Sequence, residues 1–238
     1  MNVAWQLAVP TYAVVGFFSA LVGAIGFGFV REARREYLSL LTDAGGRSLL
    51  SGVATVPTST RLPMAPLSSK PCLAWQLRVE QVKKRSGRWE LARESGCMPF
   101  TLEGDGSRRI ELAEFEFSDV FPPSEQLRLN AGDELEPTLK ERLRHLDSFE
   151  RIRRASSRAY ELREWRLEAD SECVLSGVPG DAADGLRLVD VRIAVGALQL
   201  VRRRLARALL LRAWKRAAPL LALIVAIVFL ARLAHSIW

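Results

Sequence analysis

The chain has 238 residues, of which 49% are hydrophobic and 26% charged, and its formal net charge is +7. This length allows one sizeable core, or one domain joined to membrane segments. The segment from Val201 to Arg216 holds seven cations and no acid, so the remaining basic and acidic residues balance at 27 each. A globally basic, nucleic-acid-binding surface is therefore excluded, and we expect no nucleic-acid partner.

Sulfur and imidazole groups are sparse. The three cysteines (Cys72, Cys97, Cys173) and two histidines (His145, His235) lie far apart in the sequence. A tetrahedral zinc site needs about four such ligands in close clusters, so we expect no metal and no cofactor. The odd cysteine count argues against a disulfide framework and fits a reducing compartment. We expect buried thiols and solvated histidines.

The first predicted element is a transmembrane helix over residues 1–30, which contain no charged side chain. The 22 uncharged residues from Val9 to Val30 slightly exceed the ~20 that a helix needs to cross hydrocarbon. Glycines in this segment permit close helix–helix association in a membrane. The alternative is a cleaved secretory peptide, but the segment lacks a basic start and a convincing cleavage site.

Short strands are predicted next. Residues 47–56 form a first strand, and a turn-rich crossing with four prolines follows at residues 57–71. From Cys72 to Lys84, apolar and polar residues alternate, which predicts a half-buried strand. We place a hairpin tip at residues 85–88 and a return strand from Trp89.

Further turn signals extend the β region. Gly104-Asp105-Gly106 is a strong hairpin signal. Residues 159–178 predict strands joined by a turn at 168–172, and residues 186–195 form one more strand or lead into a helix. About half a dozen short strands predict a mainly β fold, a small closed or nearly closed barrel.

One helical insertion is predicted at about residues 134–158, which are rich in charge. Leu139, Leu143, Leu146 and Phe149 recur at three- to four-residue spacing, so we expect this stripe to pack on the sheet.

The chain ends in two predicted helical segments, a basic juxtamembrane helix at 197–216 and a second transmembrane helix at 217–238. Ala217 to Ala231 is an uncharged run of 15 residues, about 22 Å of helix, so we expect Arg232 to extend its side chain outward and Trp214 and Trp238 to mark the interfaces. An amphipathic or core helix is the alternative. The residues expected at the membrane surface are Arg202, Arg203, Arg204, Arg207, Arg212, Lys215 and Arg216.

Basic clusters set the orientation. Arg31, Arg34 and Arg35 follow the first predicted span, and the seven cations precede the second. Both clusters flank the central segment, so the positive-inside rule places that segment in the cytoplasm and both termini outside the cell membrane.

An ordered set of motifs runs through residues 47–178. Its members are Gly52, Ala65-Pro66-Leu67-Ser68, Pro71-Cys72, Trp75, Pro99-Phe100-Thr101-Leu102, Asp105-Gly106, Tyr160, Glu164 and Gly177. The set resembles the GIDE domain, also called the beside-a-membrane domain. That domain lies between two transmembrane helices in membrane-anchored RING ubiquitin ligases and in prokaryotic relatives. The resemblance implies structural roles for Gly52, Pro66, Ser68, Cys72, Pro99, Phe100, Asp105, Gly106, Tyr160, Glu164 and Gly177.

Two departures from this family matter. Ala169-Asp170-Ser171 stands where the family has a Pro-Gly-Asp turn. A RING needs about eight Cys or His ligands, four for each of two zinc ions, and the sequence holds five such residues.

No catalytic set emerges from the residues. Ser68, Ser69 and Cys72 have no identifiable base nearby in sequence, and we expect Cys72 to be packed. Glu164 either pairs with Arg78 across strands or binds a partner, and Trp75, Trp89 and Trp165 should pack in the core or at its rim.

These patterns predict a membrane-anchored, non-catalytic interaction module that binds a protein partner or lipid headgroups. The alternatives are a component of ubiquitin transfer, as the family resemblance implies, and a membrane hydrolase. A subunit that packs its glycine-rich first span on a partner helix is a third reading.

Overall fold

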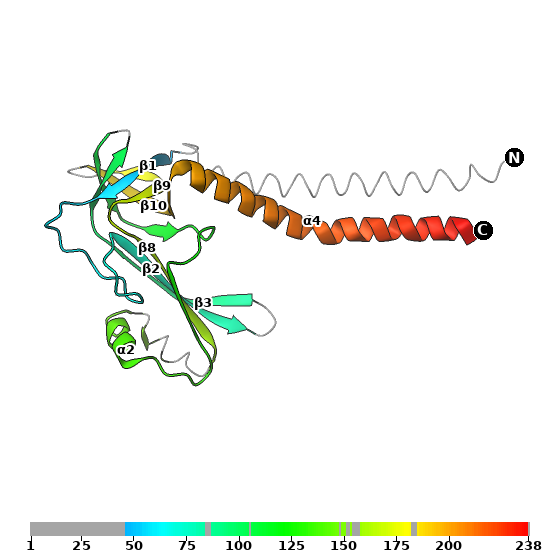
Figure 1. Ribbon diagram of the computed structural model, residues 1–238, viewed down its shortest axis with the longest axis horizontal. Helices are drawn as coiled ribbons and strands as arrows, with labels where there is room; N and C mark the ends of the chain where they lie inside the picture. Colours follow the sequence, from blue (N-terminus) through cyan, green and yellow to red (C-terminus); the bar gives the residue numbers. More distant parts are fainter. Residues whose placement is uncertain are drawn as a thin grey trace. The chain divides into compact units, whose positions relative to one another are not determined.

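The computed structural model describes residues 46–83, 87–104, 106–147, 149–150, 153, 158–181 and 185–237. The chain divides into two compact units, residues 40–202 and residues 1–39 with 203–238. The described strands and helix α2 belong to the first unit, whereas helix α4 (Leu198–Ile237) begins in the first unit and continues into the second (Figure 1).

Five strands form a barrel in the first unit. These strands follow the order β5-β4-β1-β9-β10, and a parallel pairing between β10 and β5 closes the ring. Their bounds are β1 Ser48–Thr55, β4 Phe100–Gly104, β5 Arg108–Leu112, β9 Ser171–Gly180 and β10 Leu186–Val195. The mainly β fold and the small barrel predicted from the sequence are therefore confirmed.

Strand β6 (Phe115–Phe117) continues the edge that β5 begins. Leu186–Leu188 of β10 pair with β5, and Val191–Ile193 pair with β6. Between them β10 is irregular at Val189–Arg192, where Asp190 adopts a φ of 51°. Such a bulge bends a strand, as closure of a small barrel requires.

The remaining strands form a separate antiparallel sheet in the order β3-β2-β8-β7. Its strands are β2 Ala74–Lys83, β3 Gly87–Cys97, β7 Glu125–Leu129 and β8 Tyr160–Leu167. The described strands thus number ten in two sheets, and the expectation of half a dozen strands in one barrel is wrong in this respect. The sequence reading missed β6 and β7 because both are short and lie in charged surroundings.

Two apolar clusters hold this unit together. The first fills the barrel and continues onto the ends of β2 and β8, where Ala74, Trp165 and Leu167 join it. The second lies on one face of the four-stranded sheet, where Leu77, Val79 and Leu162 meet helix α2 (Pro137–Leu143). Leu139 and Leu143 are buried in this cluster, with Leu146 and Phe149 packed against it, so the predicted apolar stripe is confirmed.

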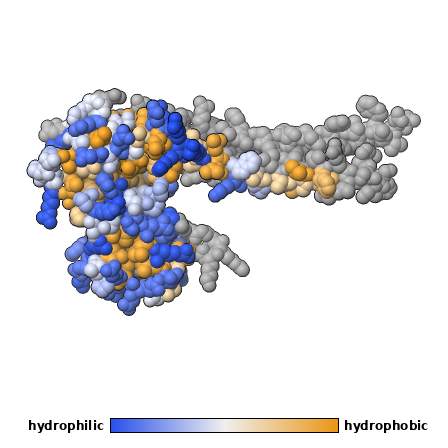
Figure 2. Space-filling model, in the orientation of Figure 1, coloured by the Kyte–Doolittle hydropathy of each residue, from blue (hydrophilic) through white to orange (hydrophobic). Residues whose placement is uncertain are grey.

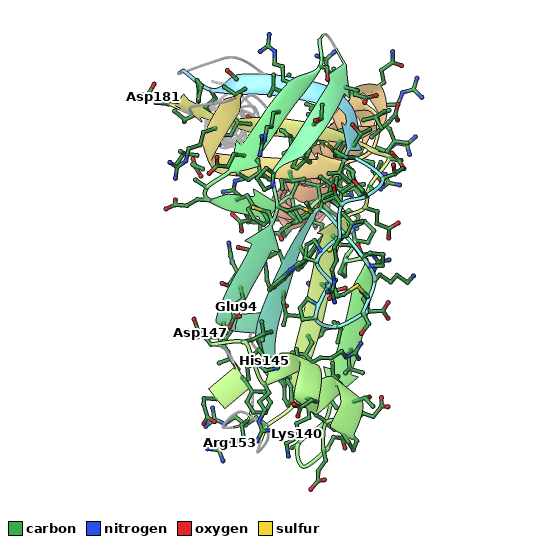
Figure 3. All side chains as sticks on the ribbon, turned by 90° about the vertical axis from the view of Figure 1, so that its left-hand side faces the viewer. Glu94, Lys140, His145, Asp147, Arg153 and Asp181 are labelled. Atoms are coloured by element: carbon green, nitrogen blue, oxygen red, sulfur yellow. The ribbon has the colours of Figure 1, made fainter. Side chains whose placement is uncertain are left out.

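The predicted insertion at 134–158 is only partly helical in the described chain. Helix α2 covers its first third, and residues 148, 151–152 and 154–157 lie outside the described residues. His145 follows α2 in a turn and is exposed; it lies at the end of the unit that α2 occupies, together with Lys140 and Arg153 (Figure 3).

Glycine is required where β1 meets β4. Gly52 and Gly104 face each other in the ladder. A Cβ at Gly52 would lie 2.2 Å from the Glu103 carbonyl oxygen, and one at Gly104 would lie 2.3 Å from that of Ser51. The two backbones can approach this closely only without side chains.

The predicted first span lies outside the described residues. Over the part of the chain that the structure describes, no helix combines the length and the apolar character needed to cross a membrane. Helix α4 covers both segments predicted at 197–216 and 217–238 as one continuous helix, with Pro219 inside it.

Candidate functional site

The proline-rich crossing before β2 folds onto the carboxylate of Glu164. This side chain of β8 is fully buried, and its Oε2 accepts the Leu67 N–H at 2.6 Å and the Ser68 N–H at 3.3 Å. The Ser68 hydroxyl donates to Oε1 at 2.5 Å. A carboxylate that accepts three donors satisfies a loop that would otherwise bury unpaired groups. The structure therefore brings together Ser68 and Glu164, two residues of the family motif set.

Backbone bonds complete this loop. The Ala65 N–H donates to the Lys70 carbonyl at 2.9 Å, the Ser69 N–H donates to that of Ala65 at 2.9 Å, and the Cys72 N–H donates to that of Pro63 at 3.0 Å. Ser69 adopts a φ of 55°, the conformation that lets the chain reverse. The loop thus delivers Cys72 to the start of β2.

Cys72 is buried, and its thiol is a poor nucleophile. It is fully buried, and burial raises the pKa of its thiol to about 12, with the nearby Glu164 carboxylate adding to the rise. Burial likewise raises the pKa of Cys173 to about 12. A nucleophilic cysteine needs a lowered pKa and access to its substrate, and neither thiol has them.

Glu164 does not pair with Arg78, so that prediction is wrong. Leu77 stands opposite Glu164 in the ladder, and Arg78 stands opposite Arg163. Side chains alternate along a strand, so Arg78 and Glu164 point to opposite faces of the sheet. The cation nearest to the Glu164 carboxylate is Arg166, whose Nη1 lies 3.7 Å from Oε1.

Arg78 belongs to a second polar cluster, which lies on the other face. Its side chain is almost fully buried, and its guanidinium stacks 4.7 Å from the centre of the Trp165 ring. Its Nη2 donates to Glu116 at 2.9 Å and to the Phe117 carbonyl at 3.2 Å, and its Nη1 pairs with Asp119. The predicted strand is therefore buried on both faces at Ala74–Val79 rather than on one.

Glu116 is the centre of this cluster. Its carboxylate pairs with Arg78 of β2, with Arg93 of β3 and, at 2.5 Å, with Arg192 of β10. Gln76 is fully buried and accepts the Phe117 N–H at 3.0 Å. These contacts join β6 and β10 to the four-stranded sheet, so we assign this cluster a structural role.

The remaining motif residues are distributed over both sheets and the loops between strands. Pro66, Phe100, Tyr160 and Gly177 are buried, Pro99 and Gly106 are exposed, and Asp105 lies outside the described residues. Gly106 adopts a φ of 114° in the confirmed β4–β5 hairpin. Asp170 takes a φ of 61° in the turn before β9, a left-handed conformation that Asp adopts more readily than most residues other than glycine.

Tryptophan placement departs from the prediction at one position. Trp165 is buried and donates from Nε1 to the Phe121 carbonyl at 3.1 Å, and Trp75 packs partly buried against the second cluster. Trp89, on β3, is 62% exposed. Its side chain therefore lies outside the buried core.

The basic segment forms the first part of α4. Arg202, Arg203, Arg204, Arg207 and Lys215 are exposed, and the side chains of Arg212 and Arg216 lie outside the described part. Leu210, Leu211 and Trp214 interrupt the cations and are also exposed. Blue surface gives way to pale and orange surface along the helix (Figure 2). This helix is thus cationic at its start and apolar beyond.

One cavity of about 310 Å³ opens beside β1 and the β4–β5 hairpin. Ser48, Leu50, Leu102 and Arg108 are among its lining residues. The described residues that line it contribute no carboxylate and no imidazole, so they supply no acid–base pair. Groups of three or more residues able to hold a metal ion are likewise not found within the described ranges.

Comparison with known proteins adds no relative: no family model, no curated protein and no solved structure matches the chain.

Proposed function

We propose that this protein is a membrane-tethered, non-catalytic scaffold. Two membrane-spanning helices hold the β unit at the cytoplasmic face of the cell membrane. There, its surface binds a protein partner or lipid headgroups.

The observation that carries the proposal is the continuity of α4. Strand β10 ends at Val195, and α4 begins at Leu198 after a turn in which Gly196 adopts a φ of 121°. The helix then runs for 40 residues, about 60 Å, through the cationic segment and into the uncharged run from Ala217 to Ala231. Cations followed by a wholly apolar stretch are typical of a helix that enters a bilayer.

Charge favours an anionic membrane surface as the first contact. Each cation close to such a surface contributes about 1 kcal/mol at moderate salt. Exposed Arg203, Arg204 and Arg207 share one side of α4 with exposed Leu210 and Trp214, at three- to four-residue spacing. The cations suit the headgroups, and the indole suits the boundary between headgroups and hydrocarbon.

The resemblance to the GIDE domain supports the same arrangement, because that domain lies between two membrane spans. An enzymatic role in ubiquitin transfer or hydrolysis is the alternative. The buried thiols of Cys72 and Cys173 are poor nucleophiles, which favours the scaffold. Zinc content and ubiquitin-transfer assays on the purified full chain distinguish the two: bound zinc or transfer activity would favour the enzyme.

Alkaline extraction and protease protection test the tether. We expect the full chain to stay in the membrane pellet after carbonate wash, and the β unit to resist protease added outside intact cells. A variant with Arg202, Arg203 and Arg204 changed to Gln should bind anionic vesicles more weakly, with a reduced salt dependence. The matched control is Arg108→Gln with Arg109→Gln, two exposed cations of β5. Release by carbonate, or equal loss in the control, would contradict the proposal.

A further inference from the structure

Strand β7 leaves one edge of the four-stranded sheet open. It stands last in the order β3-β2-β8-β7, and among the described residues it pairs with β8 alone. Figure 3 shows it at the margin of this sheet. An unpaired strand edge presents backbone donors and acceptors to which another strand can add.

Two residues of β7 direct their backbone groups to this open side. The Ser124 N–H donates to the Glu164 carbonyl at 2.7 Å, so the backbone of Glu164 faces β7. Its ladder partner is Glu125, and because the direction alternates along a strand, every second residue after Glu125 also faces β8. Gln126 and Arg128 therefore point their N–H and C=O groups outward. Both residues are exposed, and no described residue pairs with these backbone groups.

The neighbouring residues do not extend the open edge. The Ser124 N–H is engaged by Glu164, and the Asn130 N–H donates to the Asp133 carboxylate at 2.7 Å. Between these two ends, the described strand contains no proline and keeps a continuous register against β8. Proline and a mid-strand bulge are common means of blocking an edge, and this strand uses neither.

The outward groups are complementary to those of a second copy of the chain. In an antiparallel pair related by a two-fold axis, Gln126 can stand opposite the partner's Arg128, with Leu127 at the axis. This register uses all the outward groups and needs nothing from Ser124 or Asn130. A register centred on Gln126 would need the engaged Ser124 N–H. One centred on Arg128 would place two arginines directly opposite each other, which is unfavourable.

The side chains agree with the register centred on Leu127. Leu127 is half-buried against the second apolar cluster, and the partner's Leu127 would cover its remaining surface. On the other face, Arg128 would lie beside the partner's Gln126. Glu125 would stand opposite the partner's Leu129, so this register places no like charges directly opposite each other.

We propose that β7 joins two copies of this chain by antiparallel pairing about Leu127, so that the four-stranded sheet continues from one copy into the other. A second copy is the occupant that the edge favours, because its two outward residues satisfy each other. The inference goes beyond the proposed tether and does not depend on it.

Disulfide cross-linking of the full chain in native membranes tests the register. Leu127→Cys is oxidised with copper phenanthroline in a Cys97→Ser background, which removes the half-buried native thiol. In a non-hydrogen-bonded antiparallel pair, opposite Cα atoms lie about 4.5 Å apart, within the range of a disulfide. The matched control is Glu125→Cys, on the same face of β7. We expect at least about fivefold more disulfide-linked dimer from Leu127→Cys than from this control.

Arg128→Pro tests the hydrogen bonds of the edge. Proline removes an N–H that β7 does not use toward β8, and edge strands tolerate it. Added to Leu127→Cys, it should reduce the dimer to the level of the Glu125→Cys control. Arg128→Gln keeps the N–H and should leave the dimer in place. Urea unfolding establishes that each variant is folded.

Equal cross-linking of Leu127→Cys and Glu125→Cys, or cross-linking that persists in folded Arg128→Pro, would overturn the pairing. Slow hydrogen exchange at Gln126 and Arg128 in protein that does not cross-link would assign the edge to a different segment and overturn it as well. Cross-linked protein that carbonate wash releases would retain the dimer and overturn the tether. Protein that stays in the pellet without cross-linking would retain the tether and overturn the dimer.

Discussion

Replacing Glu164 tests whether its carboxylate holds the loop that introduces β2. In Glu164→Gln, the amide oxygen can still accept the Leu67 and Ser68 N–H groups, and the amide nitrogen can donate to the Ser68 oxygen. The substitution keeps the shape and removes the charge. Glu164→Ala removes the acceptor altogether.

The magnitude follows from the three hydrogen bonds. A bond to a charged acceptor contributes about 1.5–3 kcal/mol and a neutral one about 1 kcal/mol, so Gln should lower the free energy of unfolding by roughly 1–3 kcal/mol. Ala leaves buried donors unpaired and removes one of the two carboxylates that pair with the almost buried Arg166, so its cost should reach about 4 kcal/mol or more. That is a large share of the ~5–15 kcal/mol typical of a domain.

Urea unfolding of the full chain in mild detergent, followed by tryptophan fluorescence, measures these changes. Hydrogen exchange of residues 65–72 adds a local measurement, because the Leu67 and Ser68 amides lose their acceptor. The control is Glu168→Gln: Glu168 is half exposed and pairs with Arg166 at 2.6 Å, so its loss should cost less than about 1 kcal/mol. The reasoning fails if the free energy of unfolding of Glu164→Gln lies within about 0.5 kcal/mol of that of the unchanged protein and hydrogen exchange in residues 65–72 is not faster.

Four other outcomes are expected. Gly52→Ala should destabilise the barrel by about 2 kcal/mol or more in the same urea assay, whereas Gly180→Ala, whose nearest neighbour would lie at 3.7 Å, should be nearly neutral; equal effects would refute the close approach of β1 and β4. Iodoacetamide at pH 8 should modify half-buried Cys97 before Cys72 and Cys173, as read by mass spectrometry. The folded thiols of Cys72 and Cys173 have a pKa near 12 against 9.0, so their contribution to stability is complete below pH 9 and is lost as the pH rises toward 12; a melting temperature that stays level above pH 9 would contradict this. Glu116→Gln should lower stability by about 1–3 kcal/mol because three arginines lose a charged partner, and a negligible change would show that solvent replaces it.

Short sequence patterns correctly predicted β2, the β4–β5 hairpin and the buried side of α2. The alternation from Leu73 to Val79 predicted β2, and the glycines around Asp105 predicted the β4–β5 hairpin. The spacing of Leu139 and Leu143 predicted the buried side of α2. Each of these signals is contained within a few residues, so no knowledge of distant partners is needed.

Short stretches of sequence did not predict which strands pair with each other. The turn at 168–172 was expected to join two strands, and it does, but β8 belongs to the four-stranded sheet and β9 to the barrel. The Asp170 N–H in this turn donates to the Ala54 carbonyl of β1 at 2.8 Å, a contact more than one hundred residues away in sequence. Strands that follow each other in sequence usually pair, but β8 and β9 are consecutive and belong to different sheets.

The polar face of β2 shows the same limit most clearly. Gln76 and Arg78 read as solvated because polar residues alternate with apolar ones. They are buried because β6, only three residues long, lays the Phe117 backbone and the Glu116 carboxylate over them. The sequence of β2 alone does not show that β6 packs over these two side chains. A buried Arg78 is tolerable only when carboxylates and an aromatic face replace water, and Glu116, Asp119 and Trp165 do so. The cover and the charge it neutralises therefore depend on each other, and because Phe117 is also buried in the barrel core, β6 couples the polar face of β2 to the packing of the barrel.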